Sequence, residues 1–175
     1  MRSRRENYWL LILKCFFTLE FMRAVIQRVS EAVVRVDGAV VGAIYPPRGG
    51  LLVFLGCGQG DTAADVAWLV SKVTKLRVFE DAQGRMSESL LEVSGQALVV
   101  SQFTLYGSLK KGSRPSFSRA AEPGLAEPLY QQFIADLALG LGRPVATGQF
   151  GAQMEVDAKN EGPVTLVLDS RLRDF

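Results

Sequence analysis

Alternating and continuous apolar runs predict strands in the first third of the chain. Arg23–Val29 alternates moderately and is rich in Val and Ile, as is typical of a strand. Residues 32–44 read AVVRV-DG-AVVGAI, and an Asp-Gly pair between two β-branched runs predicts a hairpin with a type I′ turn at Asp37-Gly38. The short apolar run Leu51–Leu55 predicts a buried strand.

Helical spacing of apolar residues occurs twice. Asp61 or Thr62 can cap a first helix, and its apolar stripe consists of Val66, Leu69, Val70, Val73 and Leu76. A second helix is predicted from about Leu125 to Leu139, with one apolar face formed by Leu125, Leu129, Phe133 and Leu137. Pro128 is expected in its first turn, where the missing N–H costs nothing.

The remaining pattern predicts further strands separated by turns. Asp81–Gly84 is typical of a turn, and Ala97–Leu105 predicts a strand that leads into a loop over residues 106–121. Three more apolar stretches follow the second helix, at Val145–Phe150, Met154–Ala158 and Val164–Leu168. Two helices among about seven strands predict an α+β fold with sheets partly covered by helices.

The first 21 residues differ from the rest. They begin basic and then turn apolar, which resembles a signal peptide, but Lys14 interrupts the apolar run and no small-residue cleavage site follows. The run Tyr8–Phe17 is too short to span a membrane. Because MRAVIQRV from Met22 has the pattern of a strand, we expect residues 1–21 to be an extension outside the fold and residues 22–175 to form a single domain.

Composition excludes several kinds of catalytic site. The 175 residues contain no histidine, so neither a Ser-His-Asp or Cys-His arrangement nor an HExxH zinc site can form in one chain or a homo-oligomer. Two cysteines, Cys15 and Cys57, are too few for a four-cysteine zinc site or a secreted disulfide scaffold. We therefore expect no metal, no cofactor and a cytoplasmic location.

The charge distribution argues against nonspecific nucleic-acid binding by the whole surface. The formal net charge is +2, and residues 1–21 carry all of that excess. The body is therefore neutral, and any contact with RNA has to use a local patch. The loop over residues 106–121 contains Lys110, Lys111, Arg114 and Arg119 and no acidic residue. It is a candidate for contact with phosphates, with a merely solvated loop as the alternative.

Few side chains qualify for chemistry on their own. Cys57 lies between glycines after an apolar strand and lacks an imidazole partner, which favours a small buried residue over a nucleophile. The segment GCGQG is not a phosphate-binding loop, because no GK[ST] follows. Two other segments are unusual. Polar hydroxyls interrupt an apolar strand in SQFTL at residues 101–105, and a Gly-Pro step lies in NEGPVT at residues 160–165.

In these segments the sequence resembles the bacterial D-aminoacyl-tRNA deacylases. The similarity runs from Met22 to about Ser170, and it depends on five motifs: MRAVIQRV, LLVFLG, SQFTL, RPSFS and NEGPVT. It departs from the family pattern in the residues before Met22 and in a slightly longer loop at 45–48. The resemblance implies mixed or antiparallel sheets that form a barrel-like layer with helices packed on one side. It also implies a homodimer, no membrane association, and active sites at the subunit interface.

The implied reaction is hydrolysis of the ester between a D-amino acid and the 3′ end of tRNA, and some family members also remove glycine from tRNA(Ala). The implied catalytic segment is Ser101, Gln102, Phe103 and Thr104, with backbone N–H groups as donors to the developing oxyanion. Thr104 is either a nucleophile or a pocket wall. Because no base lies near it in sequence, we favour attack by water helped by the 2′-hydroxyl of the terminal ribose.

Chiral selectivity is implied for Gly162-Pro163. A cis bond there would point carbonyl oxygens into the partner subunit's pocket, where they would fill the space of an L side chain. Arg28 matches an arginine that anchors this loop, with an ordinary surface strand residue as the alternative. Met154 and Phe150 match pocket residues, although core packing explains them equally well.

Two other functions stay open. One is a tRNA-binding or dimeric scaffold protein without turnover, and the other is a hydrolase of small esters that uses a Ser or Thr nucleophile.

Overall fold

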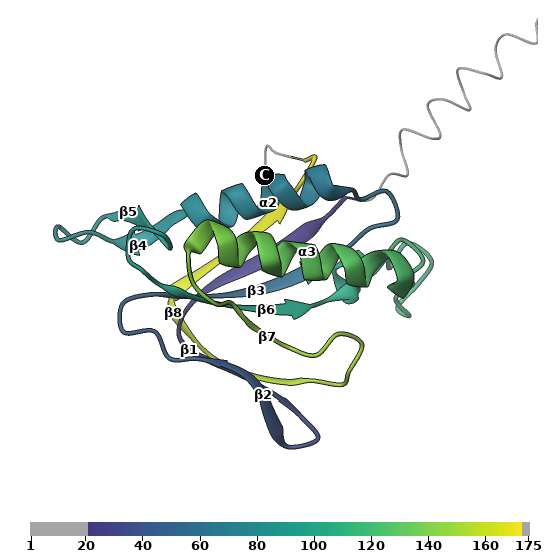
Figure 1. Ribbon diagram of the computed structural model, residues 1–175. Coiled ribbons are helices and arrows are strands. Elements are labelled where there is room, and N and C mark those ends of the chain that lie inside the picture. The colour runs from purple at the N-terminus through teal and green to yellow at the C-terminus, as the bar shows by residue number, and fades with distance from the viewer. Residues whose placement is uncertain (1–20, 173–175) are drawn as a thin grey trace, which may run out of the picture.

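The structure is a computed structural model that describes residues 21–172 (Figure 1). Strands alternate with two long helices along the chain. In order, the elements are β1 (Arg23–Val36), β2 (Ala39–Ile44), β3 (Gly50–Gly56), α2 (Ala63–Lys75), β4 (Arg77–Glu80), β5 (Met86–Ser89), β6 (Gln96–Ser101), the 3-10 helix η1 (Phe103–Tyr106), α3 (Pro123–Leu141), β7 (Ala146–Thr147) and β8 (Glu155–Asp169).

A mixed sheet of six strands forms the body. Its order is β2-β1-β3-β6-β7, and β8 pairs with β1. The long β1 is antiparallel to β2, β3 and β8, whereas β6 is parallel to both β3 and β7. β2 approaches β7 so closely that a Cβ on Gly42 would lie 2.1 Å from the carbonyl oxygen of Thr147. Only glycine fits this contact, which brings the two ends of the sheet together into a barrel-like layer.

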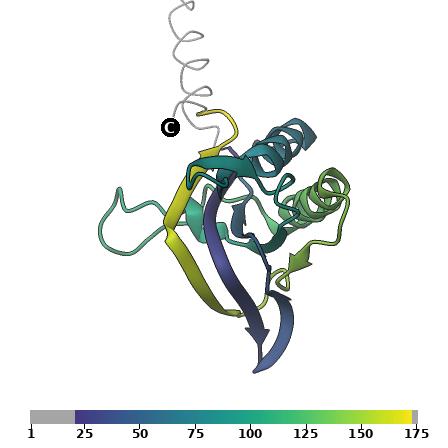
Figure 2. The ribbon, with the colours of Figure 1, turned by 90° about the vertical axis from the view of Figure 1, so that its left-hand side faces the viewer.

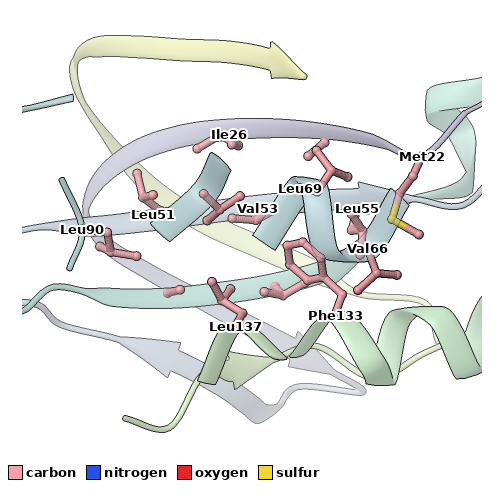
Figure 3. Close-up of a cluster of buried hydrophobic side chains, with 14 of the residues drawn as sticks. Met22, Ile26, Leu51, Val53, Leu55, Val66, Leu69, Leu90, Phe133 and Leu137 are labelled. Atoms are coloured by element: carbon pink, nitrogen blue, oxygen red, sulfur yellow. The ribbon is translucent and has the colours of Figure 1, made fainter. Parts of the chain in front are cut away.

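Both helices cover the same face of the sheet (Figure 2). Side chains from α2 and α3 pack on β1, β3 and β6 in the main hydrophobic core, which includes Leu69, Phe133, Leu137, Leu51 and Val53 (Figure 3). A smaller cluster on the opposite face includes Leu52, Leu98 and Val100. β3 is therefore buried on both sides, which explains its continuous apolar run. The predicted α+β class and the barrel-like layer with helices on one side are confirmed.

Several sequence-based predictions of elements hold. The turn after β1 has φ of 51° at Asp37 and 79° at Gly38, as a type I′ turn requires. α2 begins after Thr62, whose N–H donates to the carboxylate of Asp65 at 2.9 Å. The turn at Asp81–Gly84 closes with a hydrogen bond of 2.9 Å between the N–H of Gly84 and the carbonyl of Asp81.

Other predictions of elements were wrong. The strand expected over Ala97–Leu105 ends at Ser101, because the chain then turns into η1. Pro128 is not in the first turn of α3, which begins at Pro123, so Pro128 lies inside the helix. Three boundaries also differ: the two strands expected before residue 37 are one strand, β7 covers only two residues of Val145–Phe150, and both stretches after residue 153 belong to β8.

Two sequence-based predictions concern the N-terminal extension and membrane spans. Residues 1–20 lie outside the described residues, so the expected extension stays a prediction. Within residues 21–172, neither long helix is apolar enough over a sufficient length to cross a membrane.

Candidate active site

The SQFTL segment lies where two parallel strands end. Ser101 is the last residue of β6 and pairs with Leu55 of β3. The N–H of Gln102 donates to the carbonyl of Leu55 at 2.7 Å, which is the last rung before the chain turns into η1. Among the described residues, the N–H groups of Phe103 and Thr104 have no acceptor. Two backbone donors are therefore available at the end of the sheet.

A pocket of about 540 Å³ opens beside this turn. Its far wall is held by the segment before α3, because the N–H of Ala121 donates to the carbonyl of Cys57 at 2.8 Å. The ring of Phe117 packs edge-on against Phe103 at 5.1 Å between centroids. The lining includes Leu55, Cys57, Ser101, Gln102, Phe103, Phe117, Ala121, Glu122, Ala126, Tyr130, Phe150, Gln153 and Met154. It is mostly apolar with a few polar groups, as is typical of a small-molecule site.

The ionisable groups of the lining offer no strong nucleophile. Burial, followed by the nearby Asp61 carboxylate, raises the pKa of the Cys57 thiol to about 12. Burial also raises the pKa of Tyr130 to about 12, and its hydroxyl donates to the carbonyl of Val99 at 2.9 Å. Both groups are therefore protonated at neutral pH. Among the described lining residues, Glu122 is the only one with a charged side chain.

Thr104 is placed differently from its three neighbours in the motif. Ser101, Gln102 and Phe103 line the pocket, whereas Thr104 is exposed and does not. Its Oγ1 accepts a short hydrogen bond from the side-chain amide of Gln102. Among the described residues, no carboxylate or amine contacts this hydroxyl, so nothing there can take its proton.

The Gly162-Pro163 segment lies away from the pocket of its own chain. The bond between the two residues is cis. They form part of a bulge in β8 opposite Arg28, which pairs with Leu51 near the start of β3, whereas Ser101 pairs with Leu55 near its end. Four residues of strand separate these positions by about 13 Å. One chain alone therefore does not bring Gly162 and Pro163 to Ser101, while Met154 does reach the pocket.

Arg28 is buried, so it is not the ordinary surface residue that the sequence allowed as an alternative. It is 7% exposed, its Nε donates to the carbonyl of Glu161 at 3.1 Å, and its Nη1 donates to the carbonyl of Val78 at 2.7 Å. The guanidinium thus connects the bulge with the β4–β5 hairpin.

The basic loop projects at the end of the molecule where β6 ends and α3 begins (Figure 1). Reciprocal backbone hydrogen bonds of 2.8 and 3.0 Å join Ser108 and Ser116 and close the loop. Lys110, Lys111 and Arg114 lie within it, and all three are exposed. The loop therefore presents positive charge on the same side as the pocket.

Several pocket residues could not be found from the sequence. Tyr130 and Ala126 belong to the buried face of α3, and the periodic pattern marks them only as core positions. Glu122 and Ala121 precede that helix without any distinctive motif. Their place in the site depends on the long-range contact with Cys57.

Comparison with known proteins identifies the family. The family described as D-Tyr-tRNA(Tyr) deacylase matches residues 25–169. The chain belongs to this deacylase family. It is 58% identical over 153 residues to the D-aminoacyl-tRNA deacylase of Opitutus terrae, covering 87% of this chain and all of that one. It is 53% identical to that of Salinibacter ruber, over 86% of this chain and 98% of the relative.

Two solved structures have the same fold. The c-Myc DNA Unwinding Element Binding Protein superposes with a TM-score of 0.77 and 38% identity over 84% of this chain and 97% of the other. A probable eukaryotic D-amino acid tRNA deacylase superposes with a TM-score of 0.73 at 18% identity, over 85% and 98% of the two chains. The deacylases are hydrolases of ester bonds, and the protein is an enzyme of this class.

Proposed function

We propose that the protein hydrolyses the ester bond of D-aminoacyl-tRNA and releases the D-amino acid and tRNA. The observation that carries the proposal is the pocket at the end of β6, beside which the backbone N–H groups of Phe103 and Thr104 have no acceptor among the described residues. An aminoacyl ester is an activated substrate, so donors aimed at the developing oxyanion lower its barrier without a strong nucleophile.

In this mechanism water is the nucleophile. Water adds to the ester carbonyl carbon, the N–H groups of Phe103 and Thr104 bind the resulting oxyanion, and the bond to the ribose 3′-oxygen then breaks. The 2′-hydroxyl of the ribose assists the attack, and a proton passes to the departing 3′-oxygen. Two observations support water over a side-chain nucleophile. The thiol of Cys57 is protonated, and the hydroxyl of Thr104 accepts a hydrogen bond from the side-chain amide of Gln102.

We propose that the Gly162-Pro163 bulge of a second copy supplies the wall that rejects L residues. The bulge is exposed and lies too far along the sheet to act on its own pocket. Leu166 and Val167, which follow it on β8, are exposed apolar residues suited to an interface in a homodimer. A wall of this kind excludes an L side chain by collision and accepts a D residue. It also accepts glycine, so glycyl-tRNA(Ala) is included among the substrates.

Contact with tRNA is assigned to the basic loop. Lys110, Lys111 and Arg114 are exposed, and none of them makes an ion pair with another described residue. They are available for backbone phosphates of the acceptor stem once its 3′ end enters the neighbouring pocket. A cytoplasmic location follows from a tRNA substrate.

One assay separates this function from its alternatives. The protein is incubated with D-Tyr-tRNA, L-Tyr-tRNA, Gly-tRNA(Ala) and D-tyrosine methyl ester, and release of amino acid is measured. We expect release from D-Tyr-tRNA and Gly-tRNA(Ala) only. Binding without release would indicate a scaffold protein, and rapid cleavage of the methyl ester would indicate a small-ester hydrolase. Light scattering of the same sample tests the homodimer.

A further inference from the structure

Residues 161–164 form a bulge in the pairing of β8 with β1, and a second register shift lies next to it, between Val29 and Glu31. Asn160 pairs with Val29, and Thr165 pairs with Gln27. Four residues of β8 therefore stand opposite the single residue Arg28, and their backbone leaves the ladder. Without the ladder, other groups have to hold this segment in one conformation.

Arg28 holds the first half of the bulge. Its Nε donates to the carbonyl of Glu161 at 3.1 Å, and a Cβ on Gly162 would lie only 3.0 Å from its Nη2. Gly162 has φ of +120°, a region that L side chains rarely adopt. The backbone is thus packed directly on the guanidinium. Arg28 makes no hydrogen bond to the segment beyond Gly162.

The side-chain amide of Asn160 closes the second half. Its Oδ1 accepts from the N–H of Val164 at 3.1 Å, and its Nδ2 donates to Oγ1 of Thr165 at 3.0 Å. The same Oγ1 accepts from Nε2 of Gln27 on β1 at 3.3 Å. One carboxamide therefore bridges the bulge from its first flanking residue to its last, and Thr165 ties that bridge to the neighbouring strand.

We propose that Asn160 and Thr165 are positioning residues for enantiomer discrimination. They do not line the pocket of their own chain, and they act by fixing where Gly162 and Pro163 stand. This inference rests on the proposed function, in which Gly162 and Pro163 reject L substrates. A rejecting wall works only if it is rigid, because a wall that yields by a fraction of an ångström admits the wrong side chain.

The test compares kcat/KM for D-Tyr-tRNA and L-Tyr-tRNA in four variants. Asn160→Ala removes both bonds of the bridge, and Thr165→Val removes the shared hydroxyl while keeping the shape. Thr165→Ser restores the hydroxyl, and Lys159→Ala is the control, because it removes an exposed ion pair with Glu31 next to the bulge. Each lost hydrogen bond is worth about two- to twelvefold. We expect the D/L ratio to fall about tenfold in Asn160→Ala and Thr165→Val through a faster reaction with L-Tyr-tRNA. Thr165→Ser and Lys159→Ala are expected to keep the ratio of the unaltered protein.

The outcomes separate this inference from the proposed function. If the unaltered protein releases no D-tyrosine, the proposed function fails. If it does, and Asn160→Ala leaves the D/L ratio unchanged or slows both substrates equally, the positioning role is wrong. Amide exchange at Val164 provides a second readout, because its N–H loses its acceptor in Asn160→Ala and should exchange faster, whereas Lys159→Ala should leave it unchanged. If Asn160→Ala does not fold, Asn160→Asp takes its place, because it keeps the acceptor for the N–H of Val164 and loses the donor to Thr165.

Discussion

Asp61 is a buried carboxylate whose ionisation should weaken the folded state. It is 5% exposed, and only its Oδ2 is well bonded, by the N–H of Gly58 at 2.6 Å. Oδ1 has no hydrogen-bond partner among the described residues. Burial raises the pKa of Asp61 to about 7, and the negative charge of Asp65 adds to the rise. The backbone N–H groups of Gly58 and Met22 and the positive charge of Arg171 lower this pKa, but they do not outweigh burial.

The sign and size of the effect follow from this shift. The folded state holds the proton more tightly than the unfolded chain, so Asp61 causes the free energy of unfolding to fall as the pH rises from about 4 to about 7. A rise of the pKa from 3.8 to about 7 corresponds to roughly 4 kcal/mol, at about 1.4 kcal/mol per pKa unit. About one pH unit above this pKa the loss is complete and the contribution becomes flat.

Asp61→Asn should remove this dependence while keeping an acceptor for Gly58. We expect the variant to gain stability relative to the unaltered protein as the pH is raised from 4 to 8, by up to roughly 4 kcal/mol. Urea unfolding at several pH values measures the difference in stability between the two proteins, and this difference cancels the pH dependence that comes from the other carboxyl groups. Asp65 is one of these groups: burial opposes its ionisation, but hydrogen bonds from Ser170 and Thr62 outweigh burial and lower its pKa, so its own contribution to stability has the opposite pH dependence. Parallel pH profiles for the two proteins would refute the reasoning.

The same variant tests a proposal about the start of the fold. We propose that the folding unit begins at Met22, whose side chain is fully buried and whose backbone nitrogen faces Asp61. A chain beginning there carries an ammonium group at this nitrogen in place of an amide, and this group can form an ion pair with the Asp61 carboxylate. Asp61→Asn should then destabilise the shorter chain at pH 7, because it removes the ion pair, and stabilise the full-length one. Equal effects in both chains would show that the ion pair does not form.

Three further predictions concern the pocket and its surroundings. Thr104→Ala should keep most of the activity on D-Tyr-tRNA, because water attacks; loss of turnover in a folded variant would make Thr104 the nucleophile. Cys57→Ala should leave kcat unchanged at a stability cost of about 1 kcal/mol, measured by urea unfolding; a large fall in kcat would contradict the protonated thiol. Lys110→Ala combined with Lys111→Ala should raise KM for charged tRNA and flatten its salt dependence by about one unit of slope per lost phosphate contact, whereas Lys75→Ala on α2 should change neither.

Local signals predicted the elements whose causes are local. The hairpin at Asp37-Gly38 needs positive φ at both residues, and the sequence supplies the pair that adopts it. The continuity of β8 could not be seen in the same way. Gly162 and Pro163 interrupt the apolar pattern, so two strands were predicted. The ladder nevertheless resumes at Thr165, because β1 is long enough to pair with both halves.

The candidate site, like the fold, could be predicted from the sequence only where a local motif marks it. The family resemblance located SQFTL and NEGPVT, and the structure places Ser101 to Phe103 in a pocket. No local pattern could predict the wall opposite them. That wall is brought to Ser101 by the parallel pairing of β3 with β6 and by the bond from Ala121 to Cys57. Both contacts join residues far apart in the chain.

Reactivity and selectivity depend on different parts of this sheet. The donors of Phe103 and Thr104 belong to the end of β6, and a backbone N–H interacts with an oxyanion in the same way whichever enantiomer carries it. Discrimination requires an obstacle at a fixed place relative to the α-carbon, and the proposed obstacle is the bulge of a second copy, which in its own chain lies about 13 Å along the sheet from the donors. Substitutions at Asn160 and Thr165 can therefore change the D/L ratio without touching the donors. Substitutions around Ser101 should change both rates together.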